Sequence, residues 1–244
     1  MAYKPSSVPE ELKVLRILNN RMDLTSEQEK YYLYKEKGFE GEVQFDLLTE
    51  QLQSDCLILN DLLLEVNNTF FQIDTLILFQ EIIYLFEVKN YEGDYCYRKE
   101  RFETISGKEI KNSLDQINRS TSLLRQLLQK FGYHLTIEAY VVFINPEFFL
   151  YQAPTDKPII YPAQLPQLMR KLNNEPSKLL TGLQRLRINS FHCTRLNPLI
   201  PIQRFRLMII RSFLKVSLVL SVVHFYALLQ VENLCVQIVD KGKE

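Results

Sequence analysis

The chain has 244 residues, of which 46% are hydrophobic, and its 29 basic and 29 acidic residues give a formal net charge of zero. This apolar fraction is sufficient for a folded core, and the length fits one domain of about 140 residues with flanking segments, or two small domains. The four cysteines lack paired spacing, which predicts reduced thiols rather than a disulfide framework. The first eleven residues are polar and show no signal peptide, so we expect a cytoplasmic protein.

The charges are unevenly distributed along the chain. Residues 1–97 hold 8 Lys and Arg against 18 Asp and Glu, whereas residues 98–130 hold 8 against 4 and residues 151–244 hold 13 against 5. A cation excess of this kind can provide a surface for phosphate groups. For residues 98–130 an exposed helix of mixed charge explains the excess equally well.

The first 53 residues of the chain have the spacing of helices. Apolar periodicity predicts helices over Pro9–Met22 and Thr25–Lys35, and Ser26 with Glu29 fits a capping box for the second of them. Gly38 and Gly41 are expected to separate these from a third helix, about 39–53. Its expected inward seam consists of Phe39, Val43 and Leu47.

Strand signals dominate the middle of the chain. Two short strands are predicted first, Cys56–Asn60 and Leu62–Val66, and two apolar runs follow, Ile73–Phe79 and Ile82–Val88. The remaining expected elements are a strand over Tyr95–Arg101, a helix over Ile110–Phe131, strands at Leu135–Ile144 and Ile159–Ile160, and a helical segment over Pro162–Asn173.

The two apolar runs read as a hairpin with Gln80-Glu81 as a two-residue turn. In that register Leu76 faces Leu85, Asp74 faces Glu87, and Gln72 faces Lys89. Because side chains alternate along a strand, Gln72, Asp74, Leu76 and Leu78 are expected to share one face. The polar residues then form one cluster at the end of a buried hairpin.

Two opposed carboxylates need a proton, a cation or a metal ion between them when they are half-buried. Oxygen ligands at this separation suit Mg²⁺ or Mn²⁺, and Lys89 would add a positive charge for an anionic substrate such as a phosphate. The plain alternative is that Glu87 simply pairs with Lys89 or another cation at a solvated strand end.

At three motifs the chain resembles the NERD family, the nuclease-related domain. The motifs are "GFEGE" (Gly38–Glu42), "QID" (Gln72–Asp74) and "FEVKNYEG" (Phe86–Gly93). The family is similar to the PD-(D/E)xK phosphodiesterases, so the resemblance implies an α/β restriction-endonuclease-like core with a central mixed sheet flanked by helices, here preceded by N-terminal helices.

The resemblance also implies roles for individual residues. Asp74 matches the family's single Asp, Glu87 and Lys89 match the E-x-K pair, and Glu42 matches the acid of the first core helix. Metal ligands would be Asp74, Glu87 and the Val88 carbonyl, with Gln72 behind them. Gln116, within "NSLDQ", resembles a helix Gln that supports such sites; the alternative is a Gln that faces solvent.

Two features depart from the family. The turn Gln80-Glu81 lacks the glycine that relatives often have, and no C-x-x-C occurs that would match the zinc ribbon of some relatives. Zinc is therefore not expected.

We expect three regions: an N-terminal helical segment (1–36), a nuclease-related domain (37–174) and a basic, apolar C-terminal tail (175–244). Within the tail, residues 207–231 are apolar but interrupted by charges, and the longest uncharged stretch is shorter than the roughly 20 residues of a membrane span. An interfacial membrane anchor, an added packing helix and a shifted reading frame all explain it.

The combined prediction is a Mg²⁺-dependent nuclease that hydrolyses nucleic acid, with DNA as the expected substrate. Lys89 would act at the reacting phosphate, with Glu42 and Gln116 in support. The competing hypothesis is a non-catalytic module of the same fold that binds nucleic acid or a protein partner, associated with a membrane through residues 207–231.

Overall fold

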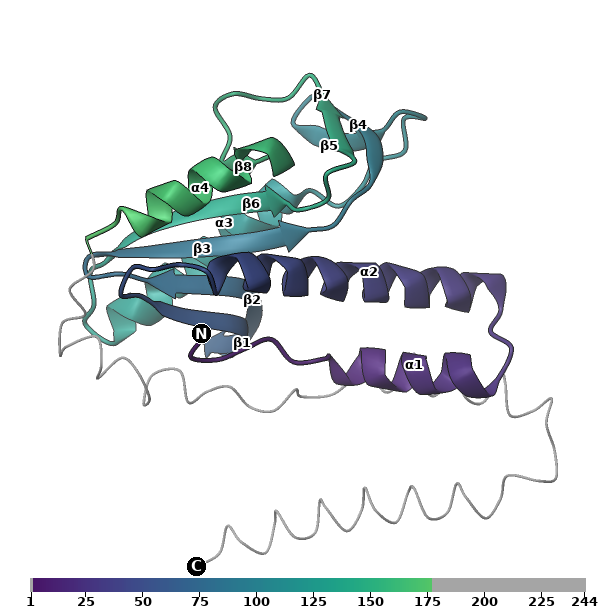
Figure 1. Ribbon diagram of the computed structural model, residues 1–244, viewed down its shortest axis with the longest axis horizontal. Helices are drawn as coiled ribbons and strands as arrows, with labels where there is room; N and C mark the ends of the chain where they lie inside the picture. Colours follow the sequence, from purple (N-terminus) through teal and green to yellow (C-terminus); the bar gives the residue numbers. More distant parts are fainter. Residues whose placement is uncertain (1, 177–244) are drawn as a thin grey trace, which may run out of the picture. The chain divides into compact units, whose positions relative to one another are not determined.

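The computed structural model describes residues 2–176, and it has an α/β fold in which helices pack against mixed β-sheets (Figure 1). The elements in chain order are α1 (Glu10–Arg21), α2 (Ser26–Thr49), β1 (Leu57–Val66), β2 (Thr69–Leu78), β3 (Ile82–Lys89), β4 (Gly93–Arg98), β5 (Arg101–Thr104), α3 (Ser113–Lys130), β6 (Thr136–Phe143), β7 (Phe148–Tyr151), β8 (Ile159–Ile160), the 3-10 turn η1 (Pro162–Gln164) and α4 (Leu165–Asn173).

The second and third predicted helices are in fact one helix of 24 residues, α2, so the predicted interruption is wrong. Thr25 caps it: its hydroxyl accepts from Gln28 N, and the Gln28 side chain accepts from Thr25 N, which places the capping box one residue earlier than predicted. Gly38 and Gly41 lie inside the helix.

The predicted inward seam of α2 is also wrong. The buried residues are Gly41, Phe45 and Thr49, whereas Leu47 is 57% exposed. Large apolar side chains favour the predicted seam, but two of the three inward positions hold a glycine and a threonine, which carry no hydrophobic signal. The helix is therefore rotated about its axis relative to the predicted seam. As a result Glu42, next to Gly41, lies at the edge of the contact with the sheet.

The main sheet has five strands in the order β1-β2-β3-β6-β8, with β1, β2 and β3 antiparallel and β3, β6 and β8 parallel. The predicted hairpin register is confirmed by the pairs Leu78↔Ile83 and Leu76↔Leu85, and Phe79 N donates to Ile82 O at 2.9 Å across the turn. The two predicted strands between Cys56 and Val66 form one strand, β1, that runs through Asp61.

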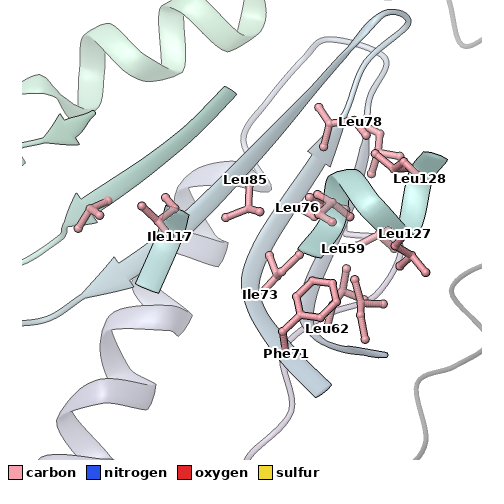
Figure 2. Packing of buried hydrophobic residues seen from close by; sticks show 14 of the residues in the cluster. Leu59, Leu62, Phe71, Ile73, Leu76, Leu78, Leu85, Ile117, Leu127 and Leu128 are labelled. Atoms are coloured by element: carbon pink, nitrogen blue, oxygen red, sulfur yellow. The ribbon is translucent and has the colours of Figure 1, made fainter. Parts of the chain in front are cut away.

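Both faces of this sheet are covered. On one face, leucines and isoleucines of β1, β2 and β3 pack with Ile117, Leu124 and Leu128 of α3 (Figure 2). On the other face, Phe45 of α2 and Leu172 of α4 pack with the remaining buried side chains of β3 and β6. Burial on both faces explains why the strands read as nearly continuous apolar runs.

A second, three-stranded sheet has the order β5-β4-β7. The single strand predicted over Tyr95–Arg101 is a hairpin instead, because Lys99 and Glu100 adopt φ values of 47° and 61° and reverse the chain. β7 was not predicted. Within residues 2–176 no helix is long and apolar enough to cross a membrane. The segment 207–231 and nearly all of the predicted tail lie outside the described residues.

Candidate functional site

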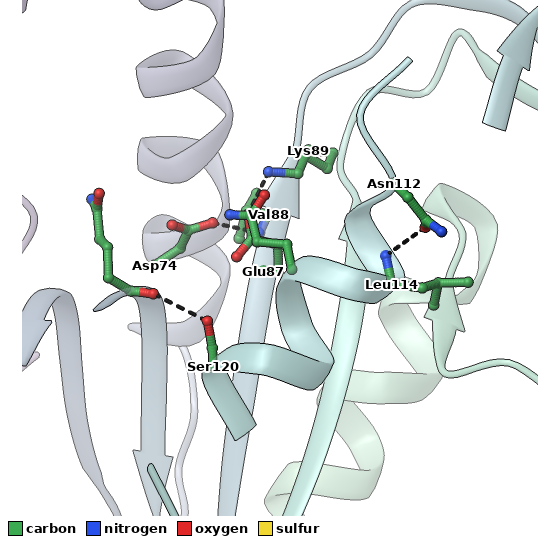
Figure 3. Close-up of polar contacts among 9 residues, drawn as sticks. Asp74, Glu87, Val88, Lys89, Asn112, Leu114 and Ser120 are labelled. Atoms are coloured by element: carbon green, nitrogen blue, oxygen red, sulfur yellow. Dashed lines mark hydrogen bonds and ion pairs between the residues drawn. The ribbon is translucent and has the colours of Figure 1, made fainter. Parts of the chain in front are cut away.

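The site lies where β2 and β3 part. Their ladder ends at the pair Thr75↔Phe86, one residue before the predicted pair of Asp74 with Glu87. Asp74 Oδ2 instead accepts a hydrogen bond from Val88 N at 2.8 Å, as Figure 3 shows. A side-chain carboxylate thus takes the place of a backbone acceptor, which holds Asp74 close to the E-x-K strand.

The alternation of side chains changes at the same point. Leu76 and Leu78 are buried against α3, but so are Phe71 and Ile73, so the predicted common face of Gln72, Asp74, Leu76 and Leu78 does not extend past Asp74. The neighbouring strand β1 shows the same change at Asp61, which has a left-handed φ of 49°.

Gln72 consequently does not face Lys89. Its side chain is exposed, and Nε2 donates to Asp61 Oδ1 at 3.1 Å, while its backbone carbonyl accepts from Ser120 Oγ of α3 at 3.5 Å. The predicted pairing of Gln72 with Lys89 is therefore wrong, because the regular ladder has ended before it reaches either residue.

Glu87 is the buried centre of the site, with 1% of its surface exposed. The ammonium group of Lys89 and the amide of Gln116 both donate to its Oε1 atom. Gln116 thus points into the site rather than to solvent, and its own Oε1 atom is buried without a hydrogen-bond partner among the described residues. Helix α3 brings an amide to the strand that carries the carboxylate.

The carboxylates strongly influence one another. Burial, followed by the negative charges of Glu87 and Glu42, raises the pKa of Asp74 well above its usual range. For Lys89, burial acts to lower the pKa, but the charges of Glu87 and Asp74 outweigh it and the pKa is raised. Lys89 is therefore a cation at neutral pH.

Glu42 is delivered by the close approach of α2 to the sheet. A Cβ atom on Gly41 would lie 2.5 Å from the Cβ atom of Asn90, just after β3, so only glycine fits there. The next residue, Glu42, has its pKa raised to about 7, first by burial and then by the charge of Asp61. The close approach to Asn90 therefore explains why the second glycine of the "GFEGE" motif, Gly41, is a glycine.

The possible metal ligands around the point where β2 and β3 separate are carboxylate oxygen atoms, which are hard ligands. Asp74, Glu87 and Glu42 interact electrostatically, but within residues 2–176 no group of three or more His, Cys, Asp or Glu side chains is clustered closely enough to hold a metal by itself. The arrangement therefore offers two carboxylates with a third in the vicinity, rather than a closed cage.

Sequence reasoning missed one acidic residue, Asp61. The β1–β2 register pairs Asn60 with Thr75 and Leu62 with Ile73, so Asp61 and Asp74 lie between the same two paired positions on adjacent strands. The two predicted strands end at Asn60 and begin at Leu62, so Asp61 falls in the gap between them, whereas β1 runs through this residue.

Comparison with known families agrees with the motifs. Residues 37–144 match the family model of NERD, the nuclease-related domain, and this span includes Glu42, Asp74, Glu87, Lys89 and Gln116. No curated protein and no solved structure matched the chain. Residues 37–144 of this chain are thus a nuclease-related domain of the NERD family.

Proposed function

We propose that this protein is a metal-dependent nuclease that hydrolyses phosphodiester bonds of nucleic acid, with DNA as the substrate. The observation that carries the proposal is the convergence of Asp74, Glu87 and Lys89 at the point where β2 leaves β3, inside a nuclease-related domain. A mixed sheet with α3 on one face and α2 and α4 on the other supports a restriction-endonuclease-like core.

The chemistry of the donors fits a Mg²⁺ or Mn²⁺ ion. Asp74 and Glu87 would hold it with the Val88 carbonyl, and Glu42 would assist directly or through water. Mg²⁺ characteristically takes one or two carboxylates and keeps several waters, so a closed cage of three acidic side chains is not required. Burial and the neighbouring carboxylates raise the pKa of both Asp74 and Glu42, and a divalent cation between these groups would relieve that repulsion.

When bound, such an ion supplies an activated water and neutralises charge on the scissile phosphate. Lys89 contributes a fixed positive charge for the negative charge that develops in the transition state, because its raised pKa makes it a poor general base. Gln116 holds the Glu87 carboxylate in one orientation through its amide donor. The cation excess of residues 98–130, which include β5 and α3, would attract the nucleic acid.

We further propose that the domain extends to about residue 174, past the matched span. Leu168 and Leu172 of α4 are buried in the same cluster as Phe45 of α2, so α4 completes the layer that covers this face of the sheet.

The second candidate function is a non-catalytic module that binds nucleic acid or a protein partner. It is favoured by the ion pair of Glu87 with Lys89 and the hydrogen bond from Gln116, which give this buried carboxylate partners within the protein. Only the nuclease requires Asp74 and Glu87 to share a divalent ion, so metal binding distinguishes the two.

The test is a calorimetric titration of the full chain with Mn²⁺. We expect binding by the wild type, loss of that binding in Asp74→Asn and Glu87→Gln, and no loss in Asp94→Asn, which changes an exposed residue of β4. A folded wild type that binds no Mn²⁺ would favour the non-catalytic module.

A further inference from the structure

The first residues of the chain form an additional edge on the main sheet. Tyr3 N donates to Ile58 O at 2.9 Å and Asn60 N donates to Lys4 O at 2.9 Å, so that Lys4 forms a parallel bridge with Leu59 of β1. Ala2 is 8% exposed and packs in the cluster of Phe45. These contacts hold the Lys4 side chain beside the middle of β1.

The ammonium group of Lys4 lies among oxygen atoms. Its Nζ is 2.6 Å from Asn60 O, 2.5 Å from Asp61 O and 3.9 Å from Asp61 Oδ2. Asp61 adopts a left-handed φ of 49°, which non-glycine residues seldom do, and its carbonyl accepts from the lysine. Two carbonyls and a carboxylate are oxygen ligands of the kind that hard divalent cations also take.

This cation lies at one end of a row of acids across three strands. Asp61 on β1 and Asp74 on β2 both lie between the paired positions Asn60↔Thr75 and Leu62↔Ile73, and Asp74 accepts a hydrogen bond from the backbone of Val88 on β3, next to Glu87. Glu42 belongs to the same group, since after burial the charge of Asp61 is the largest influence on its pKa. Lys89 compensates the Glu87 end and Lys4 compensates the Asp61 end.

We propose that Lys4 is a built-in cation at the Asp61 end of this row, in the place that a second divalent ion would take, so that the centre binds one divalent ion. This inference rests on the proposed function, because it takes the ion at Asp74 and Glu87 as given. Lys4 is thus a positioning residue that fixes the charge and the ion count of the centre without touching the substrate.

The test counts the Mn²⁺ ions bound per full-length chain, from the signal of free Mn²⁺ in electron paramagnetic resonance. We expect one ion for the wild type, two for Lys4→Met and one for Lys4→Arg, which restores the charge. The matched control is Lys13→Met, because Lys13 is exposed and pairs with Glu10 on its own helix. The double variant Lys4→Met with Asp61→Asn should return to one ion, since the second position then lacks its carboxylate.

An unchanged count of one in folded Lys4→Met, or a count of two in the wild type, would overturn the inference and leave the nuclease proposal standing. A wild type that binds no Mn²⁺ overturns both. If Lys4→Met does not fold, Asp61→Asn in the wild-type background decides: we expect one ion with unchanged affinity, and a lost ion would show that Asp61, not Lys4, serves the metal directly.

Discussion

Lys89 is the residue on which the proposed chemistry depends most directly. Its ammonium group is bonded to Glu87 and its side chain is 17% exposed, so it combines a fixed position with access to a substrate. We expect Lys89→Ala to lower the rate of DNA cleavage by roughly 100-fold or more, the usual cost of removing one transition-state donor.

The same substitution should largely spare DNA binding, because affinity is spread over many phosphate contacts. Binding is measured by fluorescence anisotropy on the same protein, and Lys30→Ala at an exposed position of α2 is the control for loss of one charge. Cleavage by Lys89→Ala at the wild-type rate would refute the role of this lysine.

The raised pKa of Glu42 predicts how the stability of the metal-free protein depends on pH. Its pKa is about 7 in the folded chain, against an ordinary value near 4.5, so the native state retains a proton that the unfolded chain has released. The free energy of unfolding should therefore fall as the pH rises from about 5 to about 7, by at most about 1.4 kcal/mol per pH unit for this group. The raised pKa of Asp74 acts with the same sign.

Urea denaturation at several pH values measures this dependence. Glu42→Gln should make the profile flatter, whereas Glu50→Gln, at the exposed end of the same helix, should not. Stability of the metal-free wild type that increases between pH 5 and 7 would contradict the burial of Glu42 beside other carboxylates.

Among the elements, α2 provides a matched pair of glycines. A Cβ atom on Gly41 would lie 2.5 Å from the Cβ atom of Asn90, whereas one on Gly38 meets nothing within 4 Å. Gly41→Ala should therefore cost about 1–3 kcal/mol of stability through overpacking. Gly38→Ala should stabilise the helix by up to about 1 kcal/mol. Urea denaturation gives both values, and equal effects of the two substitutions would contradict the close approach of α2.

The elements also show what the sequence could predict. The β2–β3 register followed from two apolar runs around a short turn, and the motif with Glu87 and Lys89 lies on β3 as predicted. The continuity of α2 through Gly38 and Gly41 was not predictable from propensity, because tertiary packing against Asn90 overrides the local cost of glycine.

The change of face at Asp61 and Asp74 was equally hidden from a pattern argument. Alternation presumes a regular strand, and nothing in a list of apolar residues indicates where a backbone leaves the ladder. The change of face is set by the left-handed backbone of Asp61 and by the hydrogen bond from Val88 N to the Asp74 side chain. Both depend on contacts with neighbouring strands of the sheet. The E-x-K motif therefore predicted which residues lie together more reliably than how they are arranged.

At the scale of the whole described domain, α4 links the segment after residue 144 to the core. Leu172 is fully buried in the cluster with Phe45, so Leu172→Ala should cost about 2–5 kcal/mol. Leu47→Ala is the control, since Leu47 is 57% exposed and its truncation should have little effect. If residues 37–174 are one domain, Leu172→Ala lowers the midpoint of the main unfolding transition. A separate early transition that leaves the main one unchanged would contradict this extent.

Cleavage of DNA tests most directly whether the assembled centre of Asp74, Glu87 and Lys89 is a nuclease site. Supercoiled plasmid and single-stranded DNA would be incubated with the full chain in Mg²⁺ or Mn²⁺, alongside Asp74→Ala and Lys89→Ala. The nuclease proposal predicts cutting that requires the divalent ion and is lost in both variants. Absence of cutting by the folded wild type, or cutting that persists undiminished in both variants, would contradict it.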